Sequence, residues 1–403
     1  NDKLAEVKKV YQYVKFASYD KETQMLCLVN KYDFMDLSVF YLDFEIEEDG
    51  YKLFEDRLEL PALRPDDTML IKLPYNLELD ETKESFINIQ ARFKDANLWA
   101  EKDYPMASAQ FALNKIDGRL KPIEESKEAF DIKEDSKQIT LENKGFKISF
   151  DKQNGEILYW KYDGFEVISD RKGSPHYNNN RWIENDKHGD SISGELASTC
   201  EIKLNKERTK AEIKVTTKGE KCPYIIEYTV YSNNIVDMKV TMNPIVEGLR
   251  RLGLGMIFSK DFEEIDYYAK GPWENYNDRQ EASFVGRYST TVSDMLTPYA
   301  HPQSCGNRQE MREIFLYKKG STKGLKIEAN QPIAFSMLHF DDKDFNKEKL
   351  HPWELEAREE VYAHFDFVQR GLGNGSCGPQ TIEKYQVPSS GTYSFTLRFS
   401  PLR

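Results

Sequence analysis

The 403-residue sequence lacks the cysteine and histidine patterns of several protein classes. No C-x-x-C spacing occurs, and the six histidines show no metal-ligand spacing such as H-x-H or H-E-x-x-H. The cysteines are odd in number and far apart: Cys27, Cys200, Cys222, Cys305 and Cys377. The cysteine spacing does not suggest a disulfide framework, and the lack of C-x-x-C excludes a zinc ribbon and a thioredoxin-like redox motif.

The sequence also lacks long apolar runs and an excess of positive charge. No run approaches the roughly 20 apolar residues of a membrane helix, and residues 1–10 hold no signal-peptide core, so we expect a soluble chain without membrane contact. Lys and Arg total 56 against 68 Asp and Glu, a net charge of −12 that disfavours nucleic-acid binding. The sequence begins with Asn rather than Met, which fits a piece of a longer protein.

What is present is a hydrophobic period of two. Apolar residues alternate with polar ones in four clear stretches, at 42–46, 146–150, 236–242 and 393–399. Such alternation is typical of antiparallel strands with one packed and one wet face. Helical periodicity is confined to short stretches such as 4–11 and 353–361, and no repeated strand–helix pattern appears. The sequence therefore predicts an all-β protein.

A charged segment divides the chain. Residues 121–137 read KPIEESKEAFDIKEDSK and hold few apolar residues, which predicts a charged linker. The part before it has the size of an immunoglobulin-like β-sandwich, about 100 residues. We therefore predict such a sandwich at 1–120, the linker at 121–137, and a larger β-sandwich with long loops at 138–403.

Three loop-like segments carry unusual mixtures of aromatic and polar side chains. They lie at 271–279 (GPWENYNDR), 297–308 (TPYAHPQSCGNR) and 364–379 (HFDFVQRGLGNGSCGP). Aromatic faces and planar polar groups together recognise sugars, but the same residues also build rigid loops whose Asp and Arg satisfy each other. Cys377 lies in a glycine-flanked loop, and a nucleophilic role would need a base such as His364 or His301.

These segments resemble one family. GPWENYNDR, the stretch SFVGRYSTTVSDMLTPYAHPQSCGNRQEMR and HFDFVQRGLGNGSCGP resemble the C-terminal small-chain region of β-galactosidases of glycoside hydrolase family 2. LAEVKKVYQYVKF, VNKYDF and LPALRPDD resemble the immunoglobulin-like domain that follows the catalytic barrel of that family. The resemblance implies an immunoglobulin-like sandwich followed by a galactose-mutarotase-like β-sandwich, also called a supersandwich.

The resemblance further implies an activity that this chain holds only in part. A family member is a retaining glycosidase that hydrolyses terminal non-reducing β-D-galactose with two glutamates on a TIM barrel. No eightfold strand–helix pattern occurs here. We therefore expect a non-catalytic, inactive C-terminal part that packs on the barrel of the same polypeptide. No cofactor is expected in this part, because the Mg and Na that the family often uses bind at the barrel. The parent is expected to be a homo-oligomer.

By the resemblance, the last sandwich completes the rim of the galactoside site. The residues expected to face sugar or form its rim are Trp273, Asn275, Tyr276, Asp278, Arg308, His364 and Cys377. Cys377 stands where the family often has Trp or Cys. The segment RWIEND adds Arg181, Asn185 and Asp186, although it lacks the usual Ala-Pro pair and is one residue short. Two alternatives stay open: a galactoside-binding module or small subunit that acts in trans, and an aldose epimerase that uses His364 or His301.

Overall fold

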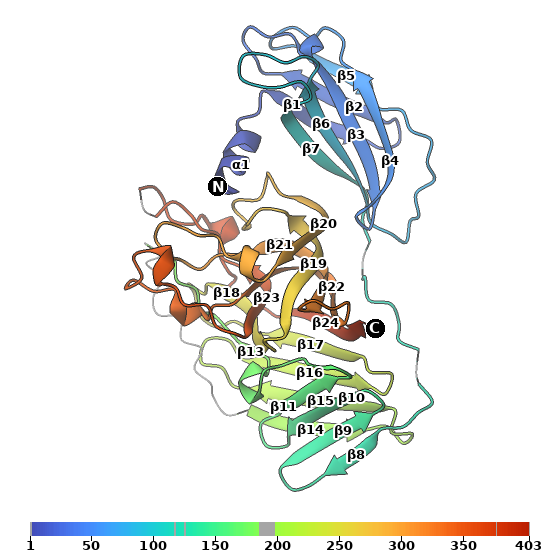
Figure 1. Ribbon diagram of the computed structural model, residues 1–403, viewed down its shortest axis with the longest axis vertical. Coiled ribbons are helices and arrows are strands. Elements are labelled where there is room, and N and C mark those ends of the chain that lie inside the picture. Colours follow the sequence, from blue (N-terminus) through green and yellow to red (C-terminus); the bar gives the residue numbers. More distant parts are fainter. Residues whose placement is uncertain (1, 117, 125, 185–197, 376, 403) are drawn as a thin grey trace. The chain divides into compact units, whose positions relative to one another are not determined.

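A computed structural model describes residues 2–116, 118–124, 126–184, 198–375 and 377–402. The chain divides into two compact units, the first being Asn1–Asp117 with Glu281–Arg287 and the second Gly118–Gln280 with Tyr288–Arg403. Strands dominate both units (Figure 1), which confirms the predicted all-β class. Among the helices that the structure describes, none combines the length and the apolar character needed to cross a membrane.

The first unit has one helix and two sheets. Helix α1 (Asp2–Val10) precedes the three-stranded sheet, whose order is β1 (Val14–Asp20), β2 (Met25–Asn30) and β5 (Thr68–Lys72). The four-stranded sheet has the order β4 (Tyr51–Glu59), β3 (Phe40–Glu48), β6 (Ser85–Phe93) and β7 (Pro105–Asn114). A 3-10 turn, η1 (Leu37–Val39), precedes β3.

The alternation predicted at 42–46 is confirmed in β3. Leu42, Phe44 and Ile46 are buried in the core of the first unit, which includes side chains from both sheets. Asp49 and Gly50 have positive φ values of 47° and 75° and join β3 to β4. Two successive positive φ angles match the twist of a hairpin, which is why Asp-Gly suits this turn.

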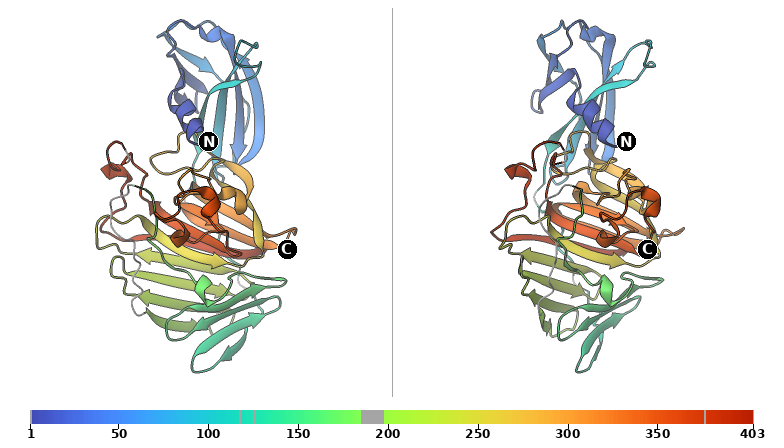
Figure 2. Two further views of the ribbon diagram at one scale, coloured as in Figure 1. Left: turned by 60° about the vertical axis from the view of Figure 1, so that its left-hand side comes forward. Right: turned by 90° about the vertical axis from the view of Figure 1, so that its left-hand side faces the viewer.

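In the described residues, most of the second unit consists of a 12-stranded and a 5-stranded sheet, although β20 begins in the part that belongs to the first unit. Figure 2 shows the strands of these sheets from two sides. The main path of the large sheet runs through β13 (His176–Tyr177), β18 (Arg251–Phe258), β23 (Val361–Gln369), β22 (Gly324–Leu338), β24 (Tyr393–Leu402), β17 (Val236–Met242), β16 (Tyr224–Tyr231), β15 (Lys210–Thr217) and β14 (Ser198–Leu204). Off this path, β19 (Phe262–Gly271) pairs with β20 (Phe284–Thr291) and with β21 (Arg308–Lys318), which also pairs with β22. The 3-10 turns in the described part of this unit are η2 (Arg171–Gly173), η3 (Ser293–Met295), η4 (Asp342–Asp344), η5 (Pro352–Glu354) and η6 (Glu383–Tyr385).

The 5-stranded sheet corrects part of the linker prediction. Its order is β12 (Phe165–Glu166), β11 (Ile157–Tyr162), β10 (Phe146–Asp151), β9 (Gln138–Asn143) and β8 (Asp131–Glu134). Strand β8 lies inside the segment predicted as a charged linker and pairs with β9. It is an edge strand with mostly exposed side chains, so its charged sequence does not prevent backbone pairing.

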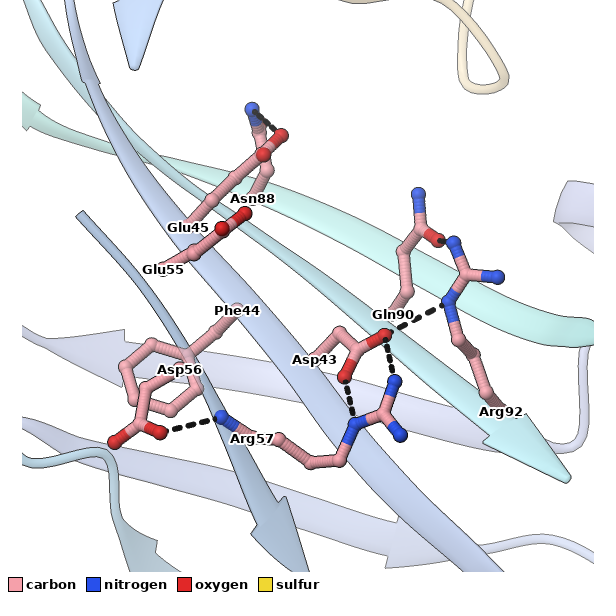
Figure 3. Close-up of a pocket in the computed structure, with 9 residues that line it drawn as sticks. All are labelled: Asp43, Phe44, Glu45, Glu55, Asp56, Arg57, Asn88, Gln90 and Arg92. Carbon is pink, nitrogen blue, oxygen red and sulfur yellow. Dashed lines mark hydrogen bonds and ion pairs between the residues drawn. The ribbon is translucent and has the colours of Figure 1, made fainter. Parts of the chain in front are cut away.

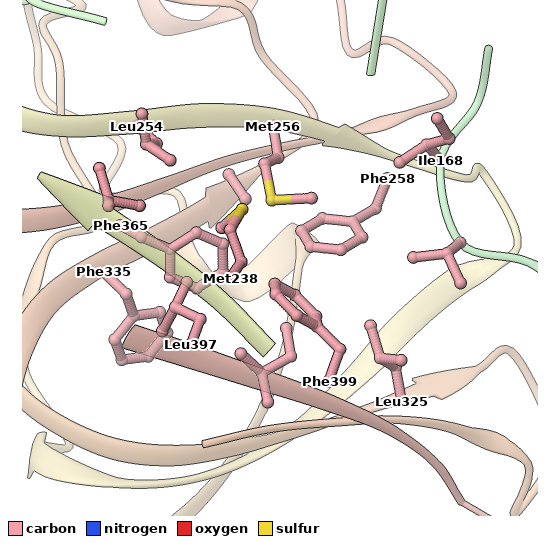
Figure 4. Packing of buried hydrophobic residues seen from close by; sticks show 14 of the residues in the cluster. Ile168, Met238, Leu254, Met256, Phe258, Leu325, Phe335, Phe365, Leu397 and Phe399 are labelled. Atoms are coloured by element: carbon pink, nitrogen blue, oxygen red, sulfur yellow. The ribbon is translucent and has the colours of Figure 1, made fainter. Parts of the chain in front are cut away.

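Large apolar side chains fill the core of the second unit. Figure 4 shows Met256, Phe258 and Phe365 from β18 and β23 packed near Met238 and Phe399 from β17 and β24. In the stretches 146–150, 236–242 and 393–399, every second residue is apolar, as predicted, and its side chain lies in or against this core.

Candidate functional site

Four segments of the second unit meet in one place, which we call the loop cluster: 181–184, 271–279, 297–308 and the described residues of 369–379, namely 369–375 and 377–379. Asn277 Nδ2 donates to the Gln369 carbonyl at 2.8 Å, and the Gly373 N–H donates to Asp278 Oδ2 at 2.8 Å. A Cβ built on Gly371 would lie 2.6 Å from the Asp278 carboxyl carbon. A glycine is therefore needed for the last segment to approach the 271–279 segment so closely.

Glu274 joins the 271–279 and 297–308 segments. Its fully buried carboxylate accepts hydrogen bonds from Arg279 and the Tyr299 hydroxyl, and at 2.8 Å from the Gly306 N–H. Burial, followed by the negative charge of Glu274, raises the pKa of Tyr299, so that its hydroxyl remains a hydrogen-bond donor. The carboxylate thus has a cation and two neutral donors, which offset the cost of its burial.

Asn275 holds the loops by its side chain and its backbone. Its Nδ2 donates to the Trp273 carbonyl at 2.8 Å, and its Oδ1 accepts from the Gln309 N–H at 2.8 Å. Asn307 Nδ2 donates to the Asn275 carbonyl at 2.7 Å. The amide of Asn275 is therefore engaged within the protein.

Tyr276 and Arg308 are also buried in the loop cluster. The Tyr276 hydroxyl donates to the Ser304 carbonyl at 3.4 Å, and burial raises the pKa of Tyr276 well above its ordinary value. Arg308 donates from Nη1 to the Asn307 carbonyl at 3.2 Å. Among the predicted site residues that the structure describes, only Trp273, 43% exposed, and Cys377 present exposed side chains.

The segment 181–184 belongs to the same cluster. Arg181 is buried and donates to the carbonyls of Arg370 and Gly371, the latter at 3.4 Å from Nη2. The Trp182 N–H donates to Ser304 Oγ at 2.9 Å. Asn185 and Asp186, which the sequence analysis also predicts at the rim of the sugar site, lie outside the described residues.

His364 belongs to a second buried cluster, on β18, β23 and η4. Its Nε2 lies 3.0 Å from Asp342 Oδ2, and Arg251 Nη1 donates to Asp366 Oδ2 at 2.8 Å. Gln369 donates to Asp366 Oδ2 at 3.3 Å and accepts from Asn277, so this ionic cluster is connected to the loop cluster. We call it the strand cluster.

Sequence reasoning missed Glu274, Arg279 and Tyr299 as the centre of the loop cluster. All three stand in the segments that were singled out, but 68 acidic residues give no means of choosing Glu274 from composition. Within the described ranges, no group of three or more His, Cys, Asp or Glu side chains could hold a metal ion.

Two pockets lie away from the loop cluster. One, of about 520 Å³, lies over the four-stranded sheet of the first unit and is lined by Asp43, Arg57 and Arg92 among others (Figure 3). The other, of about 820 Å³, is in the second unit and is lined by residues including Glu156, His176, Tyr224 and Tyr228. Among the residues that the structure describes, neither lining includes a predicted site residue.

Comparison with known proteins identifies the class, a β-galactosidase component. Residues 142–399 match the model of the β-galactosidase small chain, and residues 26–114 match domain 4 of β-galactosidase. The chain therefore belongs to the β-galactosidase small-chain family, and the resemblance stated from the sequence is confirmed.

The relatives are longer than this chain. A β-galactosidase of Priestia megaterium is 22% identical over 418 residues, covering 99% of this chain and 40% of the relative. One of Staphylococcus xylosus is 32% identical over 152 residues, covering 38% of this chain and 15% of the relative. Among solved structures, an aldose epimerase homologue from C. elegans matches with 10% identity and a TM-score of 0.38, covering 64% of this chain and 96% of that one. The chain thus spans about 40% of the length of the P. megaterium relative.

Proposed function

We propose that this chain is the non-catalytic C-terminal part of a β-galactosidase that hydrolyses terminal non-reducing β-D-galactosides. The match of residues 142–399 to the small-chain family is the observation that carries the proposal. The relatives' remaining length supports a catalytic part in the same polypeptide, which supplies the two glutamates that a retaining glycosidase needs.

In this proposal the loop cluster forms part of the rim of the galactoside site. Its buried hydrogen bonds hold the four segments in one arrangement, so that the rim is formed before the sugar binds. Trp273 offers an exposed indole face, and Cys377 an exposed thiol. Asp278 Oδ1 is a buried carboxylate oxygen without a hydrogen-bond partner among the described residues. Asn275, Tyr276 and Arg308 act from beneath, as positioning residues.

Hydrolysis of o-nitrophenyl β-D-galactopyranoside tests the proposal. We expect turnover by the polypeptide translated from the complete reading frame and none by the 403-residue chain alone. Turnover by this chain alone would contradict the assignment of catalysis to another part. The name "small chain" favours a second arrangement, in which this chain is a separate subunit. In that case, activity would appear on mixing it with a separately encoded barrel chain.

Alkylation of Cys377 tests the rim separately from turnover. The thiol is exposed, whereas Cys222 and Cys305 are buried, so iodoacetamide should label Cys377 before these two. In the active polypeptide, saturating isopropyl thiogalactoside should slow the labelling of Cys377 and leave that of Cys27, on β2 of the first unit, unchanged. Equal labelling rates with and without the galactoside would show that Cys377 does not lie at the rim of the sugar site.

A further inference from the structure

Helix α1 turns its apolar residues outward. Leu4 is 66% exposed, Val7 49%, Val10 58% and Tyr11, directly after the helix, 76%. Residues spaced by three and four lie on one face of a helix, so these four side chains form a continuous stripe. We call it the outer stripe.

The opposite face of α1 holds the helix to its own unit by polar contacts. Glu6 accepts hydrogen bonds from the N–H groups of Glu281 at 3.0 Å and Ala282 at 2.8 Å. Lys9 donates to the Ser108 carbonyl from a partly buried position, and burial lowers the pKa of Lys9. Both anchoring residues are less exposed than the apolar residues of the outer stripe.

This arrangement is the reverse of an ordinary surface helix. A helix on a globular protein usually packs its apolar stripe on the core and presents its charges to water. A helix of nine residues is also too short to be stable in water through its own hydrogen bonds. Another surface that buried Leu4, Val7, Val10 and Tyr11 would provide the missing packing.

The comparisons indicate which surface this is. The domain 4 model begins at residue 26, so α1 lies outside both matched domains. The P. megaterium relative aligns with 99% of this chain, and this alignment takes up only 40% of the relative. A domain numbered four implies other domains in the same β-galactosidase, and α1 stands on the side of the chain that precedes domain 4.

We propose that the outer stripe is the docking surface for the catalytic part of the same polypeptide. In this arrangement α1 is fixed to the first unit through Glu6 and Lys9, and is covered by the catalytic part over Leu4, Val7, Val10 and Tyr11. The proposal rests on the proposed function, because that function supplies the partner. Helix α1 would then connect the first unit, which it contacts through polar side chains, with the catalytic part, which it contacts through apolar side chains.

Hydrogen exchange of the α1 amides tests this docking without reference to activity. The amides should exchange at least about tenfold more slowly in the polypeptide from the complete reading frame than in the 403-residue chain. The double variant Leu4→Ser/Val7→Ser should lower the melting temperature of the long polypeptide and leave that of this chain nearly unchanged. Leu70→Ser, on β5 and 65% exposed, is the control and should have a small effect in both.

Three results would overturn the docking. The first is equal exchange of the α1 amides in the two polypeptides. The second is protection in this chain alone, with a dimer in sedimentation that Leu4→Ser/Val7→Ser dissociates, because the occupant would then be a second copy. The third is a reading frame without a catalytic part. An active long polypeptide with unprotected α1 would refute the docking alone. An inactive one with protected α1 would refute the proposed hydrolysis alone.

Discussion

The two units treat the charges on their sheets in different ways. In the second unit, the strand cluster buries Arg251 against Asp366 at 2.8 Å and His364 against Asp342 at 3.0 Å. In the first unit, Glu45 and Glu55 stand directly opposite each other on β3 and β4, beside an open pocket. In the strand cluster each of these two carboxylates thus has a basic partner, whereas Glu45 and Glu55 bring two carboxylates together across β3 and β4.

This difference moves carboxyl pKa values in opposite directions. Burial, followed by the charge of Glu45, raises the pKa of Glu47 on β3 to about 7. Burial alone would also raise the pKa of Asp342, but the charge and hydrogen bond of His364 and the charge of Arg251 outweigh it and lower that pKa. The partner therefore decides the sign of the shift, even where burial is the largest single cause.

Among the substitutions considered, removal of the Arg251 cation from the strand cluster should lower the free energy of unfolding most. Arg251→Met leaves Asp366, which is fully buried, without its ion-pair partner. We expect the free energy of unfolding of the second unit to fall by about 3–5 kcal/mol, as for other broken buried pairs. Urea-dependent oxidation of Met256, a buried thioether on β18, read by mass spectrometry, measures this loss.

The double variant Arg251→Met/Asp366→Leu is the matched control for this prediction. It removes both charges, so most of the lost stability should return. A double variant as unstable as Arg251→Met would show that the packing of the arginine, rather than the orphaned charge, is what the cluster needs. If Arg251→Met alone were as stable as the parent, the second unit would not depend on pairing its buried carboxylate.

Loss of a charge from the loop cluster should destabilise the second unit less than loss of a charge from the strand cluster. Glu274→Gln keeps the size of the side chain but removes the charge that Arg279 and Tyr299 share. We expect a loss of about 1–3 kcal/mol in the second unit, because the Arg279 side chain, 15% exposed, can turn to water. The same Met256 oxidation reports it, and Glu356→Gln, at an exposed position, should change nothing. A loss as large as that of Arg251→Met would contradict this ranking.

Much of the fold could be predicted because strand patterning is local. The alternation of Leu42, Phe44 and Ile46 predicts the buried face of β3 without knowledge of its neighbours. Prediction fails where the local pattern is short or polar. The helical periodicity at 353–361 does not correspond to an α-helix, since Pro352–Glu354 forms one 3-10 turn and residues 355–360 contain no helix before β23 begins at Val361. The four-residue β8 is hidden by its charges, because an edge strand needs no apolar face.

The candidate site was harder to predict than the fold. The sequence identifies the segments around Trp273, Arg308 and Cys377, but not that they meet, because their contacts join distant parts of the chain. Asp278 and Gly373, for example, are 95 residues apart in sequence. Nor can composition separate a ligand-facing Asn275 from one that holds the loop, since both tasks need the same amide. Burial in the folded protein provides that distinction.

The first unit should respond to the neutralisation of Glu47. Its pKa of about 7 lies above the ordinary 4.5, so between these pH values the folded state binds more protons than the unfolded state. The stability of the first unit should therefore fall as the pH rises from about 4.5 to 7. After allowance for solvent screening, Glu47→Gln should recover about 1–2 kcal/mol at pH 8.

Urea-dependent oxidation of Met69, which packs against the core of the first unit, measures this gain, and the thioether itself does not titrate. Glu59→Gln, at an exposed position on β4, serves as the control and should leave the pH dependence intact. A variant with Glu47→Gln that is no more stable than the parent at pH 8 would show that water reaches this carboxylate freely.

The smallest effect is expected from Asp342, at low pH. Its pKa lies below the ordinary 3.8, so the folded state binds fewer protons there than the unfolded state. The stability that this group contributes is present above about pH 3.8 and is lost as the pH falls through the lowered pKa. Urea-dependent oxidation of Met256 again measures the stability of the second unit, now at several pH values below 3.8. Asp342→Asn should weaken the loss of stability with falling pH, while Asp163→Asn, at an exposed position, should leave that loss unchanged. The contribution of Glu47 to stability is lost as the pH rises, and that of Asp342 as the pH falls. If Asp342→Asn and the parent lost stability equally with falling pH, Asp342 would not contribute this dependence, and the opposite behaviour of the two carboxyls would be refuted.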